Sequence, residues 1–117
     1  MGFLSTLDNT ATIGTSEYSI LAGTTTGVPT SQTTEAVIEV VLDLSALVAG
    51  DQFELNYYEK AVSGGTQRKV NTFTYTGATF PPHIVIEPLH LKHGYDITLK
   101  KLAGTDRSIG MSARRVG

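Results

Sequence analysis

The chain of 117 residues contains no cysteine. A disulfide framework and a thiolate zinc site are therefore excluded, and stability must come from packing and strand pairing. No apolar run reaches the roughly 20 residues that span a bilayer, and no basic segment followed by an apolar one opens the chain. We therefore expect a soluble protein with no membrane partner and no visible export signal.

The charge of either sign is low. The formal net charge is −2, too small to predict attraction to nucleic acid. Its distribution is uneven, because residues 1–60 hold eight acids against one lysine, whereas residues 61–117 hold eight bases against three acids. Acidic and basic strands could simply pair within one fold. Alternatively, complementary faces could let copies pack together or dock on a charged assembly.

Sequence signals of catalysis are also missing. There is no Gly-x-Ser-x-Gly elbow, and Gly64 and Gly65 join two extended segments instead of opening a nucleotide-binding helix. Glu54 and Glu59 are five residues apart, so on a regular strand they face opposite sides and make a poor glycosidase pair. We expect no enzyme activity and no cofactor.

The histidines are the side chains whose ordinary pKa lies near neutrality. His83, His90 and His93 fall on a predicted strand and the turn after it, where their spacing does not converge on one point as it would on a helix. We therefore expect surface or cross-strand histidines and no metal site.

The segment from Gln52 to Tyr75 predicts a β-hairpin around which the domain is built. Residues 53, 55 and 57 are apolar or aromatic and alternate with Glu54, Asn56 and Tyr58, which is typical of a strand with one buried face. Only one of the two adjacent tyrosines can face outward on such a strand. An outward Tyr58 leaves a carbohydrate-binding module as an alternative function, because an exposed aromatic ring can stack on a sugar.

The rest of the chain also indicates strands separated by turns. Residues 35–42 are the most apolar and predict a central strand, and residues 43–51 predict a short plug with a single helical turn. Pro88 predicts an interrupted edge strand. We expect an all-β fold, an antiparallel β-sandwich of about eight short strands with a jelly-roll-like arrangement. Residues 1–8 are expected to form an N-terminal arm, and residues 9–117 a single domain.

Two segments are candidates for contacts with a partner. One is the arm, and the other is the threonine-rich stretch of residues 23–34, whose length and composition are typical of a long loop. Together with the hairpin, they provide the residues at which we expect partner contacts: Phe3, Leu4, Leu7, Thr25, Val28, Pro29, Tyr58 and Arg68.

Several turn and strand motifs between residues 35 and 116 resemble small β-sandwich proteins encoded among the structural genes of tailed bacteriophages. The motifs are Ala49-Gly50-Asp51-Gln52-Phe53, Tyr58-Glu59-Lys60, Ser63-Gly64-Gly65-Thr66-Gln67-Arg68, His93-Gly94-Tyr95-Asp96 and Leu102-Ala103-Gly104-Thr105-Asp106-Arg107-Ser108-Ile109. None of these motifs carries chemistry, and the arm and the threonine-rich loop lie outside the resemblance.

The resemblance implies a virion component, made in the host cytoplasm and located on the capsid surface. The role it implies is that of a capsid decoration, or cement, protein that binds the outer shell of major capsid protein, often as a homotrimer. A head-to-tail or tail component of the virion remains an alternative. No family site residue is implied.

Overall fold

The computed structural model of the chain describes residues 3–25, 32–33, 35–78 and 82–116. For residues 3–7, 87 and 116 it describes the backbone alone. Among these residues there is no helix long and apolar enough to cross a membrane. The described residues form strands β1 (Phe3–Ile13), β2 (Tyr18–Ser19), β3 (Thr24–Thr25), β4 (Ala36–Asp43), β5 (Gln52–Lys60), β6 (Gln67–Thr76), β7 (His83–Leu91), β8 (Asp96–Ala103) and β9 (Arg107–Val116).

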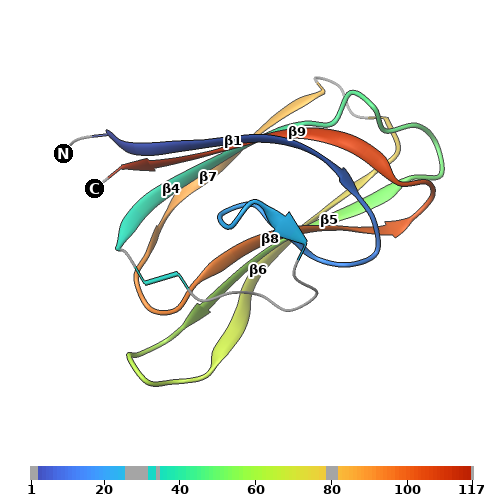
Figure 1. The fold of residues 1–117 in the computed structure, drawn as a ribbon. Helices are drawn as coiled ribbons and strands as arrows, with labels where there is room; N and C mark the ends of the chain where they lie inside the picture. Colours follow the sequence, from blue (N-terminus) through green and yellow to red (C-terminus); the bar gives the residue numbers. More distant parts are fainter. Residues whose placement is uncertain (1–2, 26–31, 34, 79–81, 117) are drawn as a thin grey trace.

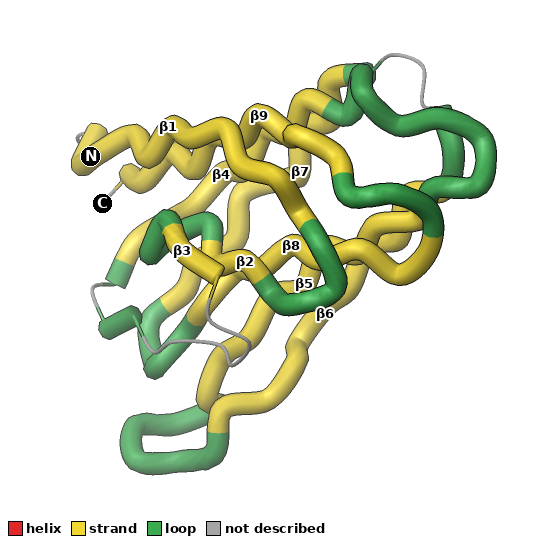
Figure 2. The backbone as a smooth tube through the Cα atoms, turned by 45° about the vertical axis from the view of Figure 1, so that its right-hand side comes forward, coloured by secondary structure: helices red, strands yellow, loops and turns green. Residues whose placement is uncertain are grey.

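The strands form two antiparallel sheets in a sandwich (Figures 1 and 2). One sheet has the order β1-β9-β4-β7, and the other has the order β3-β2-β8-β5-β6. Apart from the short β3, the chain changes sheet after β1, after β2, after β4, after β6, after β7 and after β8. This is the strand order of a jelly roll, with β3 added at one edge. The predicted all-β antiparallel sandwich is thus confirmed.

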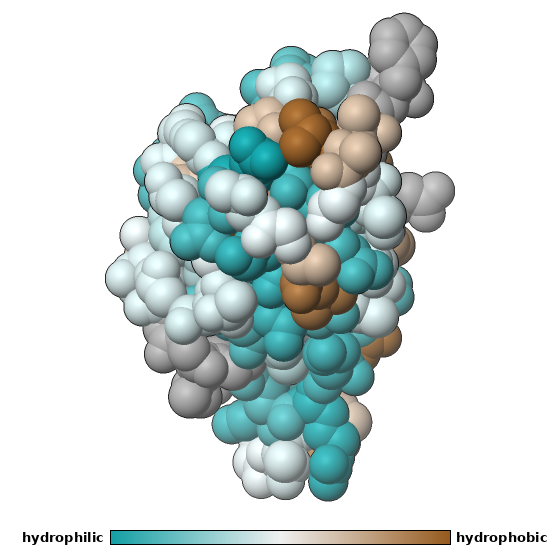
Figure 3. Space-filling view, turned by 90° about the vertical axis from the view of Figure 1, so that its right-hand side faces the viewer, coloured by the Kyte–Doolittle hydropathy of each residue, from teal (hydrophilic) through white to brown (hydrophobic). Residues whose placement is uncertain are grey.

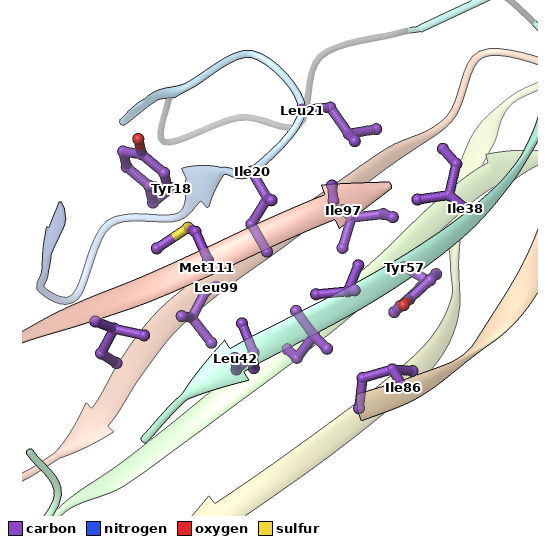
Figure 4. Packing of buried hydrophobic residues seen from close by; sticks show 14 of the residues in the cluster. Tyr18, Ile20, Leu21, Ile38, Leu42, Tyr57, Ile86, Ile97, Leu99 and Met111 are labelled. Atoms are coloured by element: carbon purple, nitrogen blue, oxygen red, sulfur yellow. The ribbon is translucent and has the colours of Figure 1, made fainter. Parts of the chain in front are cut away.

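The core lies between the two sheets. Along β4 buried and half-buried residues alternate, because successive side chains of a strand point to opposite faces. Ile38 and Leu42 from β4 meet Tyr57, Ile97 and Leu99 from the other sheet (Figure 4). The inner faces of both sheets therefore interdigitate, as the sequence alternation predicts.

The predicted β5–β6 hairpin is confirmed, including the direction of its side chains. Phe53, Leu55 and Tyr57 are fully buried, and Tyr58 lies on the outer face of the sheet. The pairing changes register where Tyr57 lies opposite Asn71 and Tyr58 lies opposite Lys69. This leaves Val70 as the extra residue of a bulge in β6.

The predictions for β4 and β7 are also confirmed. β4 lies between β9 and β7, whereas β7 is an edge strand. Ile38 pairs with Leu89 and Val40 with Ile86, so Glu87 and Pro88 together lie opposite one residue of β4. Proline lacks an N–H group, and this bulge at an edge accommodates it.

The segment after β4 fills one end of the sandwich, but it is not helical. Leu44 and Leu47 are buried, as the predicted plug requires. The expected helical turn is wrong, since the segment forms turns. The Asp43 carboxylate accepts the Ser45 N–H at 3.0 Å, and the Asp51 carboxylate accepts the Val48 N–H at 3.0 Å. These side-chain acceptors satisfy backbone donors locally and so compete with a helix.

The first strand begins inside the segment that we expected to be an arm. β1 runs from Phe3 to Ile13 and pairs with β9 along its length, with Phe3 opposite Val116 and Ile13 opposite Arg107. Residues 3–8 are therefore part of the sandwich, and the boundary expected at Asp8 falls inside a strand. The physical reason is that β9 offers an edge long enough to pair with all of β1, which the weak local pattern of residues 1–8 does not reveal.

The acidic and the basic half of the sequence are interleaved in the fold. Each sheet contains strands from both the acidic and the basic half of the chain. Ion pairs join the two halves between Glu54 and Lys69 at 3.5 Å, between Asp51 and Arg107 at 2.8 Å, and between Glu39 and Arg114 at 3.4 Å. For these residues, the interpretation that acidic and basic strands pair within one fold is confirmed.

Candidate functional site

The predicted contact residues are not gathered at one place. Phe3, Leu4 and Leu7 belong to β1, and their side chains lie outside the description. Thr25 is exposed in β3, at the edge of the five-stranded sheet, whereas Val28 and Pro29 lie outside the described residues. The last two predicted residues, Tyr58 and Arg68, belong to the β5–β6 hairpin.

Tyr58 is held in a polar network on the outer face of the five-stranded sheet. Its hydroxyl donates to Glu17 Oε1 at 2.5 Å. The same oxygen accepts the hydroxyl of Thr98 at 2.7 Å and the amide of Asn56 at 3.4 Å. Three donors from two neighbouring strands thus converge on one carboxylate that precedes β2.

The network continues to β6, and a separate hydrogen bond joins β2 to β8 on the same face. Thr72 in β6 donates its hydroxyl to Asn56 Oδ1 at 2.7 Å, and Ser19 in β2 donates to Asp96 Oδ1 at 2.8 Å. Ser19, Asn56, Asp96 and Thr98 are fully buried although they lie on the outer face of the sheet. Buried polar groups need partners, and these side chains supply them to one another.

This network has the chemistry of a structural element. Burial, together with the hydrogen bond to Glu17, raises the pKa of Tyr58 well above its ordinary value, so the phenol stays protonated at neutral pH. The hydroxyl is already donated and the ring is partly covered. The Tyr58 hydroxyl is therefore engaged within the fold, and its ring is only partly exposed.

A second carboxylate, Asp51, joins two turns at one end of the sandwich. Its oxygens accept Arg107 Nε at 2.8 Å and the Thr105 N–H at 3.1 Å, in addition to the Val48 N–H. Chiefly because of the Arg107 hydrogen bond, the pKa of Asp51 falls to about 2. Gly104 makes this arrangement possible, since its φ is +90° and an added Cβ would lie 2.2 Å from Asp51 Oδ1.

A third contact lies at the opposite end of β5, where the hairpin meets the β7–β8 turn. Glu59 accepts the N–H groups of Lys92 at 2.7 Å and His93 at 3.1 Å. Gln67 donates its side-chain amide to the Gly94 carbonyl at 2.6 Å. These bonds fix the base of the hairpin, whose turn extends away from the rest of the sandwich (Figure 2).

The motifs of the resemblance meet at these two contacts. The Asp51 contact joins the motif of residues 49–53 to that of residues 102–109. The contact at the hairpin base joins the motifs of residues 58–60 and 63–68 to that of residues 93–96. Motifs far apart in the sequence are therefore bonded to one another in the fold.

The outer face of the four-stranded sheet carries a hollow of about 430 Å³. Its floor is formed where Gly110 in β9 leaves a gap between Thr10 and Asp43, and Val41 adds apolar surface. Asp8 and His83 line its sides. A depression with an apolar floor and polar walls suits a protruding side chain of a partner protein.

Two of the three histidines, His83 and His90, lie at the surface as predicted, whereas His93 is half-buried. His83 is 3.5 Å from Asp43, and His90 is 2.6 Å from Glu35, with both imidazoles exposed. Within the described residues, there is no group of three or more His, Asp or Glu side chains that could hold a metal ion.

The exposed apolar side chains are dispersed. Val48, Val62, Val70, Val85 and Leu102 belong to different turns and strands. On the face shown in Figure 3, apolar atoms form separate spots within a mostly polar surface.

Sequence reasoning missed Glu17, Asp51 and Gly110 as structurally important positions. The partners of Glu17 lie 39 to 81 positions away, so no local pattern points to it. Asp51 follows a glycine and directly precedes a strand, and this position is a signal that could have suggested a role in a turn. No protein-family model matches this chain, and no curated protein and no solved structure shows significant similarity to it.

Proposed function

We propose that this chain is a non-enzymatic structural component of a tailed-phage virion. In this proposal it binds the outside of the shell of major capsid protein as a homo-oligomer and strengthens the capsid. The observation that carries the proposal is the bonding of the resemblance motifs to one another, at the Asp51 contact and at the base of the hairpin.

The fold supports the same proposal. Jelly rolls serve as capsid and lectin domains, so a binding role is common for this architecture. The carboxylates of Glu17 and Asp51 are bonded to strands and turns of the fold, which is a structural role and not that of a catalytic acid or base. The engaged hydroxyl and the partly covered ring of Tyr58 argue against the carbohydrate-binding alternative.

Sedimentation with capsids tests the proposal. The purified protein is mixed with expanded capsids from the phage whose genome encodes it and pelleted through a sucrose cushion. The proposal predicts saturable co-sedimentation and a higher temperature of capsid disruption. Folded protein that stays in the supernatant at all ratios would contradict it.

Two variants of one residue show whether the hollow takes part in binding. An added Cβ at Gly110 would lie 3.6 Å from Asp43 Cβ and 3.8 Å from Thr10 Oγ1, which is ordinary contact. Gly110→Ala is therefore the matched control, and Gly110→Leu fills the hollow. If the hollow receives a side chain of the shell, the leucine variant loses binding and the alanine variant keeps it.

A further inference from the structure

Strand β6 leaves one long edge of the five-stranded sheet unpaired. Among the described residues β5 is its only hydrogen-bonded neighbour, and the strand is ten residues long. It contains no proline, whereas the edge strand β7 carries Pro88 and a bulge, and the edge strand β3 is two residues long. An edge of this length presents a row of backbone donors and acceptors to a further strand.

The side chains at the end of β6 suit such a strand. Phe73 and Tyr75 point inward and are half-buried at the rim of the core, and Phe73 packs edge to face on Tyr57 with ring centroids 6.0 Å apart. Beside Phe73 lies a hollow of about 240 Å³ that is otherwise lined mainly by aliphatic side chains of β7. The rim is therefore apolar and only partly covered.

The opposite face of the same segment is uniformly polar and uncharged. Thr72, Thr74 and Thr76 are exposed on the outer face. Threonine and aromatic residues favour strands, so residues 72–76 form a regular edge. The bulge at Val70 separates it from the basic pair Arg68-Lys69.

This alternation is self-complementary in one antiparallel register. When two copies of β6 run antiparallel with Thr74 opposite Thr74, Phe73 lies opposite Tyr75 of the other copy, and Thr72 lies opposite its Thr76. Aromatic pairs and threonine pairs across strands both stabilise a sheet. No charged side chain within residues 72–76 opposes one of like sign.

We propose that two copies of this chain pair through β6, with Thr74 on the two-fold axis, so that their five-stranded sheets become one continuous sheet. The aromatic side chains of both copies then cover each other at the rim. Because a two-fold interface pairs the same surface in both copies, the assembly in solution is a dimer or a multiple of dimers. The inference does not depend on the proposed function.

Disulfide trapping tests the pairing, since the natural chain has no cysteine. Opposite residues of antiparallel strands have Cα atoms about 4.5–5.5 Å apart, within the range that a disulfide spans. Thr74→Cys should therefore form a covalent dimer under mild oxidation, at least about tenfold faster than Ser63→Cys in the exposed β5–β6 turn at equal concentration. Thr12→Cys on the other long edge strand, β1, is the second control and should also cross-link slowly.

The register has its own test. Thr72→Cys and Thr76→Cys should each cross-link poorly alone, but a mixture of the two proteins should form the mixed dimer. Circular dichroism establishes that each variant is folded, and light scattering of the natural chain gives the number of copies. A natural chain that is monomeric or trimeric overturns the inference, as does a Thr74→Cys protein that cross-links no faster than Ser63→Cys.

Discussion

Removing the Glu17 carboxylate should destabilise the protein although Glu17 lies outside the hydrophobic core. Glu17→Ala takes away the acceptor of two short hydrogen bonds, from Tyr58 at 2.5 Å and from Thr98 at 2.7 Å, and of the longer one from Asn56. A hydrogen bond to a charged group contributes about 1.5–3 kcal/mol, and an unsatisfied buried donor costs about 1–3 kcal/mol.

The exposure of each donor sets the expected magnitude. Thr98 is fully buried in the natural chain, whereas the partly exposed Tyr58 can turn toward solvent. The two contributions share one acceptor and do not add in full. We expect the free energy of unfolding to fall by about 3 kcal/mol, equivalent to about 12 °C in Tm for a domain of this size.

Urea unfolding followed by circular dichroism measures this loss. Glu17→Gln keeps a neutral acceptor oxygen and should lose only about 1 kcal/mol. Glu35→Ala is the matched control, because it removes an exposed carboxylate paired with the exposed His90 and should cost less than about 0.5 kcal/mol. An ordinary surface substitution changes the free energy of unfolding by roughly 0.5 kcal/mol at most. If the free energy of unfolding of Glu17→Ala differs from that of the natural chain by no more than this, the structural role of the network is refuted.

Three further predictions concern the turns and the core. Gly104→Ala should lower the free energy of unfolding by at least about 2 kcal/mol in a urea titration, because Gly104 has a positive φ and an added Cβ would collide with the Asp51 carboxylate. Gly64 also has a positive φ, +81°, but open space around it, so Gly64→Ala should cost only about 1 kcal/mol. Equal losses for the two variants would contradict the close approach of Gly104 to Asp51. Because the pKa of Asp51 is lowered to about 2, the stabilising effect of this carboxylate should be present above about pH 4 and be lost as the pH falls toward 2. Asp51→Asn should therefore flatten this part of the curve of unfolding free energy against pH. An unchanged curve would count against the ion pair of Asp51 with Arg107. Leu55→Ala should lower the free energy of unfolding by about 2–5 kcal/mol, measured by calorimetry or urea titration, because Leu55 is fully buried. Val85 is 60 % exposed, so Val85→Ala should lower it by less than about 0.5 kcal/mol. Similar losses for the two variants would show that the core is misplaced.

Alternation in the sequence predicted the faces of the strands well. Phe53, Leu55 and Tyr57 are buried because the period of two holds through β5, and β4 is central because its apolar residues cover both of its faces. Pro88 correctly indicated an edge, since a residue without an N–H group is poorly suited to a central strand.

What sequence reasoning missed depends on which distant strands meet. The pairing of residues 3–8 with β9 and the convergence of three donors on Glu17 follow from the jelly-roll order, in which neighbours in a sheet are far apart in the chain. Local propensity does not encode such contacts, because the sequence around a threonine or asparagine does not indicate whether a distant carboxylate will bond to its side chain. The hollow at Gly110 was missed for the same reason, since it exists only where β1, β9 and β4 lie side by side.

Cryo-electron microscopy of virions tests the central claim most directly. The particles are those of the phage that encodes the chain, compared with particles from which its gene has been deleted. The proposed function predicts jelly-roll density, into which this fold can be placed, on the outer surface of the shell of complete particles and not of deleted ones. Identical shells in the two reconstructions, or density for this fold only in the neck or tail, would contradict a decoration role.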